Sequence, residues 1–247
     1  MKNNFYFKEP FSNIYKLPNI RSEVTSQILY GERFKILSKI KGWIKIKSLY
    51  DRYSGFIKDK KYVKELKISH KVSNIKANIF KNPNTKTKKA LYFGSKLSVL
   101  EMRNGFARFE RNQWVKSKDI KKITHKEKDF VKILKLFLKT KYVWGGKTNK
   151  GIDCSALLQI FFYYNNLFYP RDTKDQIKYS KKKISKKFKK GDIIFWEGHV
   201  AICINSKQLI HAYGPEKRVI VMPINKTIKR ILNTANLKVR KISKINF

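Results

Sequence analysis

One cysteine in the second half of the chain has the surroundings of a catalytic nucleophile. Cys154 follows a glycine-rich segment and precedes an apolar run, Ala156 to Tyr164, that is long enough for a helix. At the N-terminus of such a helix, backbone N–H groups and the helix dipole favour the thiolate and lower the thiol pKa. Asp153 is predicted to cap this helix by accepting hydrogen bonds from its first N–H groups.

Two histidines twelve residues apart are the candidates for the base that would activate the Cys154 thiol. His199 and His211 lie in consecutive apolar segments, GHVAICI and QLIHAYG, which are predicted strands. In an antiparallel hairpin they lie directly opposite each other only if the loop has an odd number of residues, for instance three around Asn205. An even loop would place them on opposite faces of the sheet.

The three side chains together predict a covalent mechanism. Cys154 would be the nucleophile, His199 its base, and His211 the group that fixes the tautomer of that base. Taken singly, a buried cysteine or a strand histidine is more often structural, so the prediction depends on all three. Such a mechanism needs no metal or other cofactor, and none is predicted. His70 and His125 lie in lysine-rich linkers and are predicted to have no catalytic role.

The composition is strongly basic, with 58 Lys and Arg against 17 Asp and Glu among 247 residues, a net charge of +41. The lysines are spread along the whole chain, which predicts diffuse attraction to anionic polymers and no specific nucleic-acid recognition. A functional basic face is the alternative. Two cysteines are too few for a disulfide scaffold and suit a reducing compartment.

The chain shows neither an apolar leader before Pro10 nor a run of ~18 apolar residues. A cytoplasmic protein without a membrane span is therefore expected, with the cell envelope as the alternative.

The first half contains an internal repeat. Residues 28–37 align with residues 91–100, and residues 42–47 with residues 105–110, at the same offset of 63. Apolar and polar residues alternate in short runs broken by glycine, so each copy is predicted to be a barrel of about five strands. Beyond the repeat, a helical pattern begins at Phe130 and continues with Leu134, Phe137 and Leu138.

The repeat resembles the bacterial SH3-like modules that precede cell-wall peptidases. The second half resembles the NlpC/P60 cysteine peptidases in the ordered motifs Y-x-W-G-G, D-C-S, G-D-x-x-F-W, G-H-V-A-I and I-H-A, over residues 126–225. The resemblance implies an α+β fold in which a papain-like catalytic domain, residues 123–247, follows SH3-like domains at residues 1–69 and 70–122. Ala156 replaces the glycine of most relatives, a change that a helix should tolerate.

The same resemblance assigns site residues and a substrate. It implies a Cys154–His199–His211 triad, with the Tyr142 hydroxyl near the oxyanion site. It also implies cleavage of peptidoglycan stem peptides between γ-D-glutamate and a diamino acid. Members with tandem SH3-like modules that resemble dipeptidyl-peptidase VI recognise a free N-terminal L-alanine.

Recognition of that amine would need acceptors in the cleft. The resemblance points to Asp153, Ser155, Asp172 and Thr173, and to Glu32 if the first module folds over the cleft. Two alternatives remain: Asp172 as a helix N-cap, and Glu32 as a solvated loop residue. For the whole chain the alternatives are an exported endopeptidase that acts on intact wall, and a non-catalytic basic binding protein.

Overall fold

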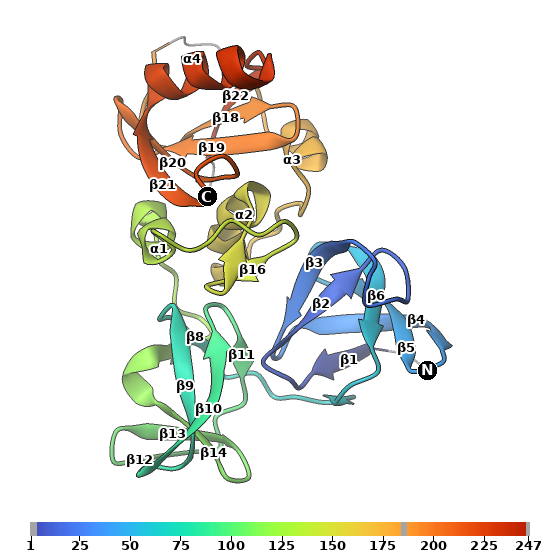
Figure 1. Cartoon of the computed structure of the whole chain (residues 1–247). Helices are drawn as coiled ribbons and strands as arrows, with labels where there is room; N and C mark the ends of the chain where they lie inside the picture. The colour runs from blue at the N-terminus through green and yellow to red at the C-terminus, as the bar shows by residue number, and fades with distance from the viewer. Residues whose placement is uncertain (1–3, 184–186, 246–247) are drawn as a thin grey trace. The chain divides into compact units, whose positions relative to one another are not determined.

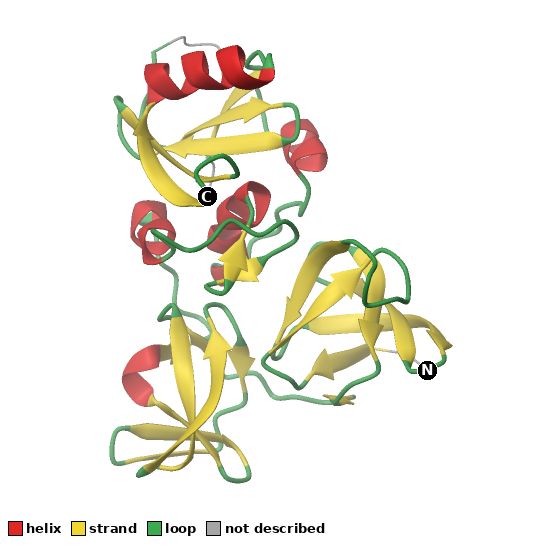
Figure 2. Ribbon diagram, viewed as in Figure 1, coloured by secondary structure: helices red, strands yellow, loops and turns green. Residues whose placement is uncertain are grey.

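The computed structural model describes residues 4–183 and 187–245 (Figure 1). The chain divides into two compact units. The first unit comprises Met1–Glu127 together with Tyr163–Asn166, and the second comprises Lys128–Phe162 and Leu167–Phe247. Strands dominate the first unit, whereas the second mixes helices with a five-stranded sheet (Figure 2). The fold class is therefore α+β, as predicted. No helix within the described residues has the length and apolar character to span a membrane.

The first copy of the repeat forms a seven-stranded sheet, in which the sequence predicted about five strands. Its order is β3-β2-β6-β5-β4-β1-β7. The alternating pattern places one apolar set inside, with Phe7, Phe34, Ile44, Ile46 and Ile57 fully buried. The strands are β1 (Asn4–Phe7), β2 (Phe11–Tyr15), β3 (Val24–Leu29), β4 (Arg33–Ile40), β5 (Trp43–Ser48), β6 (Ser54–Lys58) and β7 (Tyr62–Val63).

The second copy divides its strands between two sheets, ordered β10-β9-β14-β13-β12 and β11-β8-β15. Tyr30 from the first copy packs in the core of the second, and its hydroxyl donates to Glu110 Oε1 at 2.7 Å. Gly31 follows at φ +75°, where an added Cβ would lie 2.0 Å from the Lys96 carbonyl oxygen. The elements are β8 (His70–Val72), β9 (Lys76–Asn82), β10 (Thr85–Tyr92), β11 (Lys96–Leu97), β12 (Glu101–Arg103), β13 (Phe106–Glu110), β14 (Gln113–Lys116), a 3-10 turn (Ser117–Asp119) and β15 (Ile120–Lys122).

The second unit is built on the antiparallel sheet β21-β20-β19-β18-β22. Helix α4 packs its apolar side, including Ile224 and Ile231, against core residues of this sheet. The strands are β18 (Asp192–Trp196), β19 (His199–Cys203), β20 (Gln208–Tyr213), β21 (Arg218–Pro223) and β22 (Lys241–Lys244), and a short pair is formed by β16 (Lys147–Thr148) and β17 (Gly151–Ile152). The helices are α1 (Phe130–Leu136), α2 (Cys154–Tyr164), α3 (Thr173–Tyr179) and α4 (Ile224–Ala235).

Candidate active site

Helix α2 begins at Cys154, where the sequence placed it. Asp153 Oδ1 accepts a hydrogen bond from the Ala156 backbone N–H at 2.8 Å, which confirms the predicted N-cap. The other carboxylate oxygen accepts from the Gly145 N–H at 2.9 Å and so ties the glycine-rich loop to the helix start. Cys154 is therefore held between a capped helix and a fixed loop.

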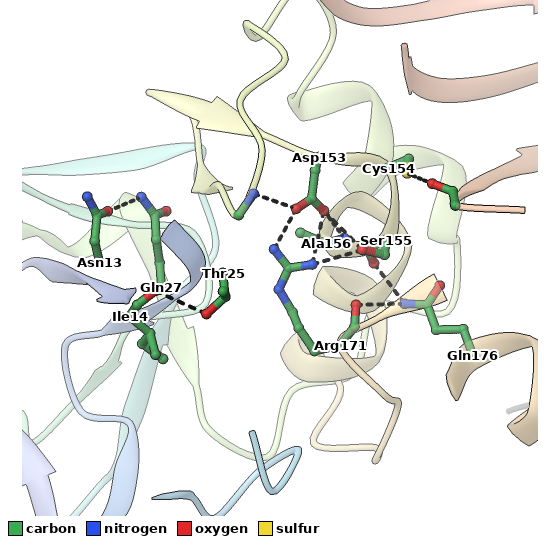
Figure 3. Close-up of polar contacts among 12 residues, drawn as sticks. Asn13, Ile14, Thr25, Gln27, Asp153, Cys154, Ser155, Ala156, Arg171 and Gln176 are labelled. Carbon is green, nitrogen blue, oxygen red and sulfur yellow. Dashed lines mark hydrogen bonds and ion pairs between the residues drawn. The ribbon is translucent and has the colours of Figure 1, made fainter. Parts of the chain in front are cut away.

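Arg171 is a member of the site that sequence reasoning did not identify. Its guanidinium binds Asp153 with two bonds, Nη2 to Oδ2 at 2.6 Å and Nη1 to Oδ1 at 3.0 Å (Figure 3). Nη1 also donates to Ser155 Oγ at 2.8 Å. Asp153 and Ser155 already bind one another and Arg171, and their predicted contact with a substrate amine stays a prediction. The signal that could have pointed to Arg171 is the need of a buried aspartate, here Asp153, for a cation beside it.

The thiol of Cys154 lies between the backbone groups that flank His199. Sγ is 3.9 Å from the Gly198 carbonyl oxygen, and the Val200 N–H donates to it. Burial first, and then the Asp153 carboxylate, raise the thiol pKa to about 11, and the opposing hydrogen bonds and Arg171 lower it less. The helix terminus was expected to lower this pKa, and that expectation is wrong because the side chain is only 5% exposed.

His199 and His211 project from the same face of the sheet. Ile202 pairs with Ile210 and Cys203 with Leu209, so the turn is centred on Ser206. The Ile204 N–H donates to the Gln208 carbonyl, which encloses three loop residues and confirms the odd loop. The two histidines are therefore diagonal neighbours instead of direct partners, and His199 Nε2 lies 3.0 Å from His211 Nδ1.

Met222 determines which nitrogens of the pair carry protons. Its thioether Sδ, which can only accept a hydrogen bond, lies 3.4 Å from His211 Nε2. We therefore assign the Nε2–H tautomer to His211, whose Nδ1 then accepts from the Nε2–H of His199. This leaves His199 Nδ1 unprotonated, as a general base for a thiol requires.

Both imidazoles are neutral near pH 7. Burial lowers the pKa of His199 to about 4. Burial, followed by the neighbouring His199 and Arg230, lowers the pKa of His211 well below its ordinary value. Both the Cys154 thiol and the His199 imidazole are therefore neutral before substrate arrives.

Replacing Met222 by leucine is expected to lower kcat about tenfold with little change in KM, since the acceptor that selects the His211 tautomer is lost while the side-chain volume is kept. The acid limb of kcat/KM should stay near pH 4, because it reports protonation of His199. Steady-state kinetics from pH 3.5 to 8 measure both. Met102→Leu, at an exposed methionine of the first unit, is the control. Unchanged kcat in Met222→Leu would contradict the tautomer assignment.

Tyr142 is near enough to Cys154 for their charges to interact. Burial, and after it the negative charge expected at Cys154 and Asp153, raise the pKa of Tyr142 above its ordinary range. Its backbone N–H donates to the Lys217 carbonyl at 2.8 Å, which fixes the segment before the glycine-rich loop. Its function at the oxyanion site stays a prediction.

Asp172 and Thr173 stand at the start of α3. Asp172 occupies the N-cap position by its backbone, but its side chain makes no capping hydrogen bond. The carboxylate has no hydrogen-bond partner among the described residues, and burial is the main cause that raises its pKa. Thr173 is buried. The side chain of Asp172 is thus left for another use than capping.

The remaining predicted residues lie in the first unit. Glu32 is buried instead of solvated, and it lies beside Tyr163, whose pKa burial and the Glu32 charge raise well above the ordinary value. Its predicted contact with substrate stays a prediction. His70 belongs to β8, and His125 Nδ1 lies 3.3 Å from the Tyr164 hydroxyl. Within residues 4–183 and 187–245, no group of three His, Cys, Asp or Glu is arranged to hold a metal ion.

Comparison with known proteins finds two family matches in this chain. The model of the NlpC/P60 family matches residues 139–235, and that of the bacterial dipeptidyl-peptidase SH3 domain matches residues 14–61. Dipeptidyl-peptidase 6 of Lysinibacillus sphaericus is 26% identical, covering 81% of this chain and 84% of the relative. The γ-D-glutamyl-L-lysine dipeptidyl-peptidase of Bacillus subtilis is 25% identical, covering 83% and 77% respectively.

The solved structures agree on the fold. The crystal structure of an NlpC/P60 family protein from Bacillus cereus superposes with a TM-score of 0.77 at 18% identity, covering 90% of this chain and 94% of that one. An NlpC/P60 endopeptidase from Photobacterium damselae gives 0.65 at 14% identity, covering 97% and 70%. The fold is thus shared over nearly the whole length of this chain.

Proposed function

We propose that this chain, which carries an NlpC/P60 domain behind a bacterial dipeptidyl-peptidase SH3 domain, is a cysteine peptidase acting on peptidoglycan stem peptides. The observation that carries the proposal is the hydrogen bond of 3.0 Å between His199 and His211, one residue from the backbone groups that contact the Cys154 thiol. A buried histidine pair ordered in this way activates a nucleophile.

The resting charges define the first step. Because the thiol pKa is about 11 and that of His199 about 4, the thiol proton moves to His199 Nδ1 as sulfur attacks the scissile carbonyl carbon. The imidazolium formed is stabilised by His211, which accepts its Nε2–H. His199 then protonates the leaving amine, and water hydrolyses the acyl-enzyme with His199 again as base. We propose that the Tyr142 hydroxyl donates to the developing oxyanion.

For the substrate, we propose the γ-D-glutamyl–diamino acid bond of peptides with a free N-terminal L-alanine. The names of two relatives, which cover more than three quarters of this chain, support dipeptidyl release. The carboxylate of Asp172 supports the free amine, because it is half-buried and has no hydrogen-bond partner among the described residues. Binding an ammonium group would offset the cost of burying that charge.

The free tripeptide L-Ala-γ-D-Glu-L-Lys is expected to be cleaved at least 30-fold more efficiently than its N-acetylated form. Loss of one partner of a half-buried charge pair costs about 2 kcal/mol or more, which sets that factor. Asp172→Asn should lower kcat/KM for the free tripeptide by a similar factor and leave the acetylated peptide nearly unaffected. Chromatographic assay of the released dipeptide measures each rate.

The control for this experiment is Asp175→Asn, an exposed aspartate on the same helix. It should change neither rate by more than about twofold, as expected for a surface substitution. Equal cleavage of free and acetylated peptides would defeat recognition of the amine and leave the peptidase assignment intact. Hydrolysis of intact wall as fast as that of the tripeptide would favour the endopeptidase alternative.

A further inference from the structure

Strands β4, β5 and β6 are neighbours in the first sheet (Figure 1). Their outward side carries a set of exposed basic side chains. Strand alternation places them there, since the residues between them, such as Phe34 and Ile46, are fully buried in the core. We call this set the basic face, and it comprises Arg33, Lys35, Lys45, Lys47 and Lys58.

The positive charge of the basic face is not compensated within its sheet. None of the seven strands, β1 to β7, contains an aspartate or a glutamate. None of the five basic side chains has an ion-pair partner among the residues that the structure describes. The face therefore presents a net positive field to solvent.

Two lysines of the basic face lie opposite each other on neighbouring strands. Lys35 on β4 lies directly opposite Lys47 on β5 in the register of the two strands. Like charges at directly opposed positions lower the stability of a sheet. Lys45 adds a third charge on the same side of β5, two residues from Lys47. This arrangement opposes folding, which makes a binding function the simplest reason for it.

The second copy of the repeat provides an internal comparison. At the offset of 63, Lys45 corresponds to Arg108 and Lys47 to Glu110. Arg108 pairs with Glu101 at 2.9 Å, and Glu110 pairs with Lys8 at 2.6 Å. The charges at these equivalent positions are thus paired in the second copy and unpaired in the first. A uniform bias toward lysine along the chain would not produce that difference.

The aromatic rings beside the face indicate the kind of polymer that fits it. The Arg33 guanidinium carbon lies 5.8 Å from the Tyr6 ring centre, and Lys45 Nζ lies 5.6 Å from that of Phe56. Rings covered by cations offer few free faces on which bases could stack, as single-stranded nucleic acids require. Lysine, a point charge, suits isolated phosphates.

We propose that the basic face is a binding surface for a linear aliphatic phosphodiester polymer. Neighbouring charges on the face are separated by about 5 Å across strands and about 7 Å along a strand, which suits one charge per repeat of an extended chain. The surface would hold the protein on an anionic polymer through its first module. The inference does not depend on the peptidase activity.

The test compares two triple variants of the full chain that remove equal charge. Lys35→Gln/Lys45→Gln/Lys47→Gln alters the basic face, and Lys86→Gln/Lys88→Gln/Lys89→Gln alters exposed lysines of β10 in the second copy. Binding of poly(glycerol phosphate) is measured at several salt concentrations. The first variant should bind at least tenfold more weakly, with the slope of log K against log salt reduced by about 2, at ~0.7 per phosphate contact. The second should change binding less than threefold.

Equal weakening in both variants would overturn the proposal, because it would show attraction by net charge alone. Tighter binding of polyuridylate than of poly(glycerol phosphate) would also overturn it, in favour of a nucleic-acid surface. The thermal midpoint of the first variant should equal or exceed that of the unmodified protein, since the opposed pair Lys35 and Lys47 is removed. Weak binding therefore could not be attributed to unfolding.

Discussion

Replacing Cys154 by alanine is expected to abolish peptide hydrolysis while the protein stays folded. Cys154 carries the thiol at the start of α2, next to the backbone carbonyl that precedes His199, and loss of one proton converts that thiol into a nucleophile. Removal of the nucleophile of such a unit leaves only residual rate from binding and oxyanion stabilisation, about 10⁶-fold below the intact enzyme. Release of the dipeptide, followed over hours at high enzyme concentration, measures the loss.

Cys203→Ala is the matched control, because Cys203 is also a buried free cysteine and lies on β19, four residues from His199. It packs in the core between the sheet and α4, so its truncation should cost about 1 kcal/mol of unfolding free energy. Its kcat should remain within twofold of the parent. Turnover that survives in Cys154→Ala but is lost in Cys203→Ala would show that Cys203 is the nucleophile and would refute the proposed site.

The parts of the site that depend on neighbouring residues could be predicted from sequence. An aspartate before an apolar run predicted both the start of α2 and its cap, because capping joins residues only three apart. The sequence made the shared face of His199 and His211 conditional on an odd number of loop residues, and the structure has three. The centre of that loop was placed one residue too early, because Asn205 Oδ1 accepts from the Lys207 and Gln208 N–H groups and shifts the turn to Ser206.

The parts that depend on distant segments could not be predicted. The thiol pKa is raised mainly by burial, and the Val200 N–H, more than forty residues along the chain, opposes that rise by donating to the sulfur. Met222 reaches His211 from the next strand, and nothing in an isolated VIVMP segment indicates that its sulfur accepts a hydrogen bond. Such effects appear only once tertiary packing is known.

Arg171 shows how such a distant contact supports the chemistry. Asp153 is needed as a cap, but a buried carboxylate beside Cys154 opposes formation of a thiolate. Arg171 pairs with that carboxylate through two bonds and itself lowers the thiol pKa. Asp153 therefore still caps α2, while the Arg171 guanidinium offsets the effect of the Asp153 negative charge on the Cys154 thiol.

Replacing Arg171 by methionine should therefore lower both stability and turnover. The Asp153–Arg171 pair is almost fully buried, and removal of one partner of a buried pair costs about 3–5 kcal/mol. Asp153→Asn/Arg171→Met removes both charges and should recover at least half of that loss, since asparagine also caps helices. Urea unfolding of the single and double variants measures the coupling, which should exceed about 2 kcal/mol.

The control for this cycle is Arg108→Met, which breaks the half-exposed pair with Glu101 and should cost less than about 1 kcal/mol. Kinetics separate a positioning function of Arg171 from a purely structural one. If Arg171 offsets the Asp153 charge at the thiol, Arg171→Met should lower kcat at least tenfold at temperatures where it is fully folded, and Arg171→Lys should restore part of it. A folded Arg171→Met enzyme with normal kcat would show that Arg171 contributes to stability only. The Cys154 thiol would then react equally well beside an unpaired Asp153 carboxylate.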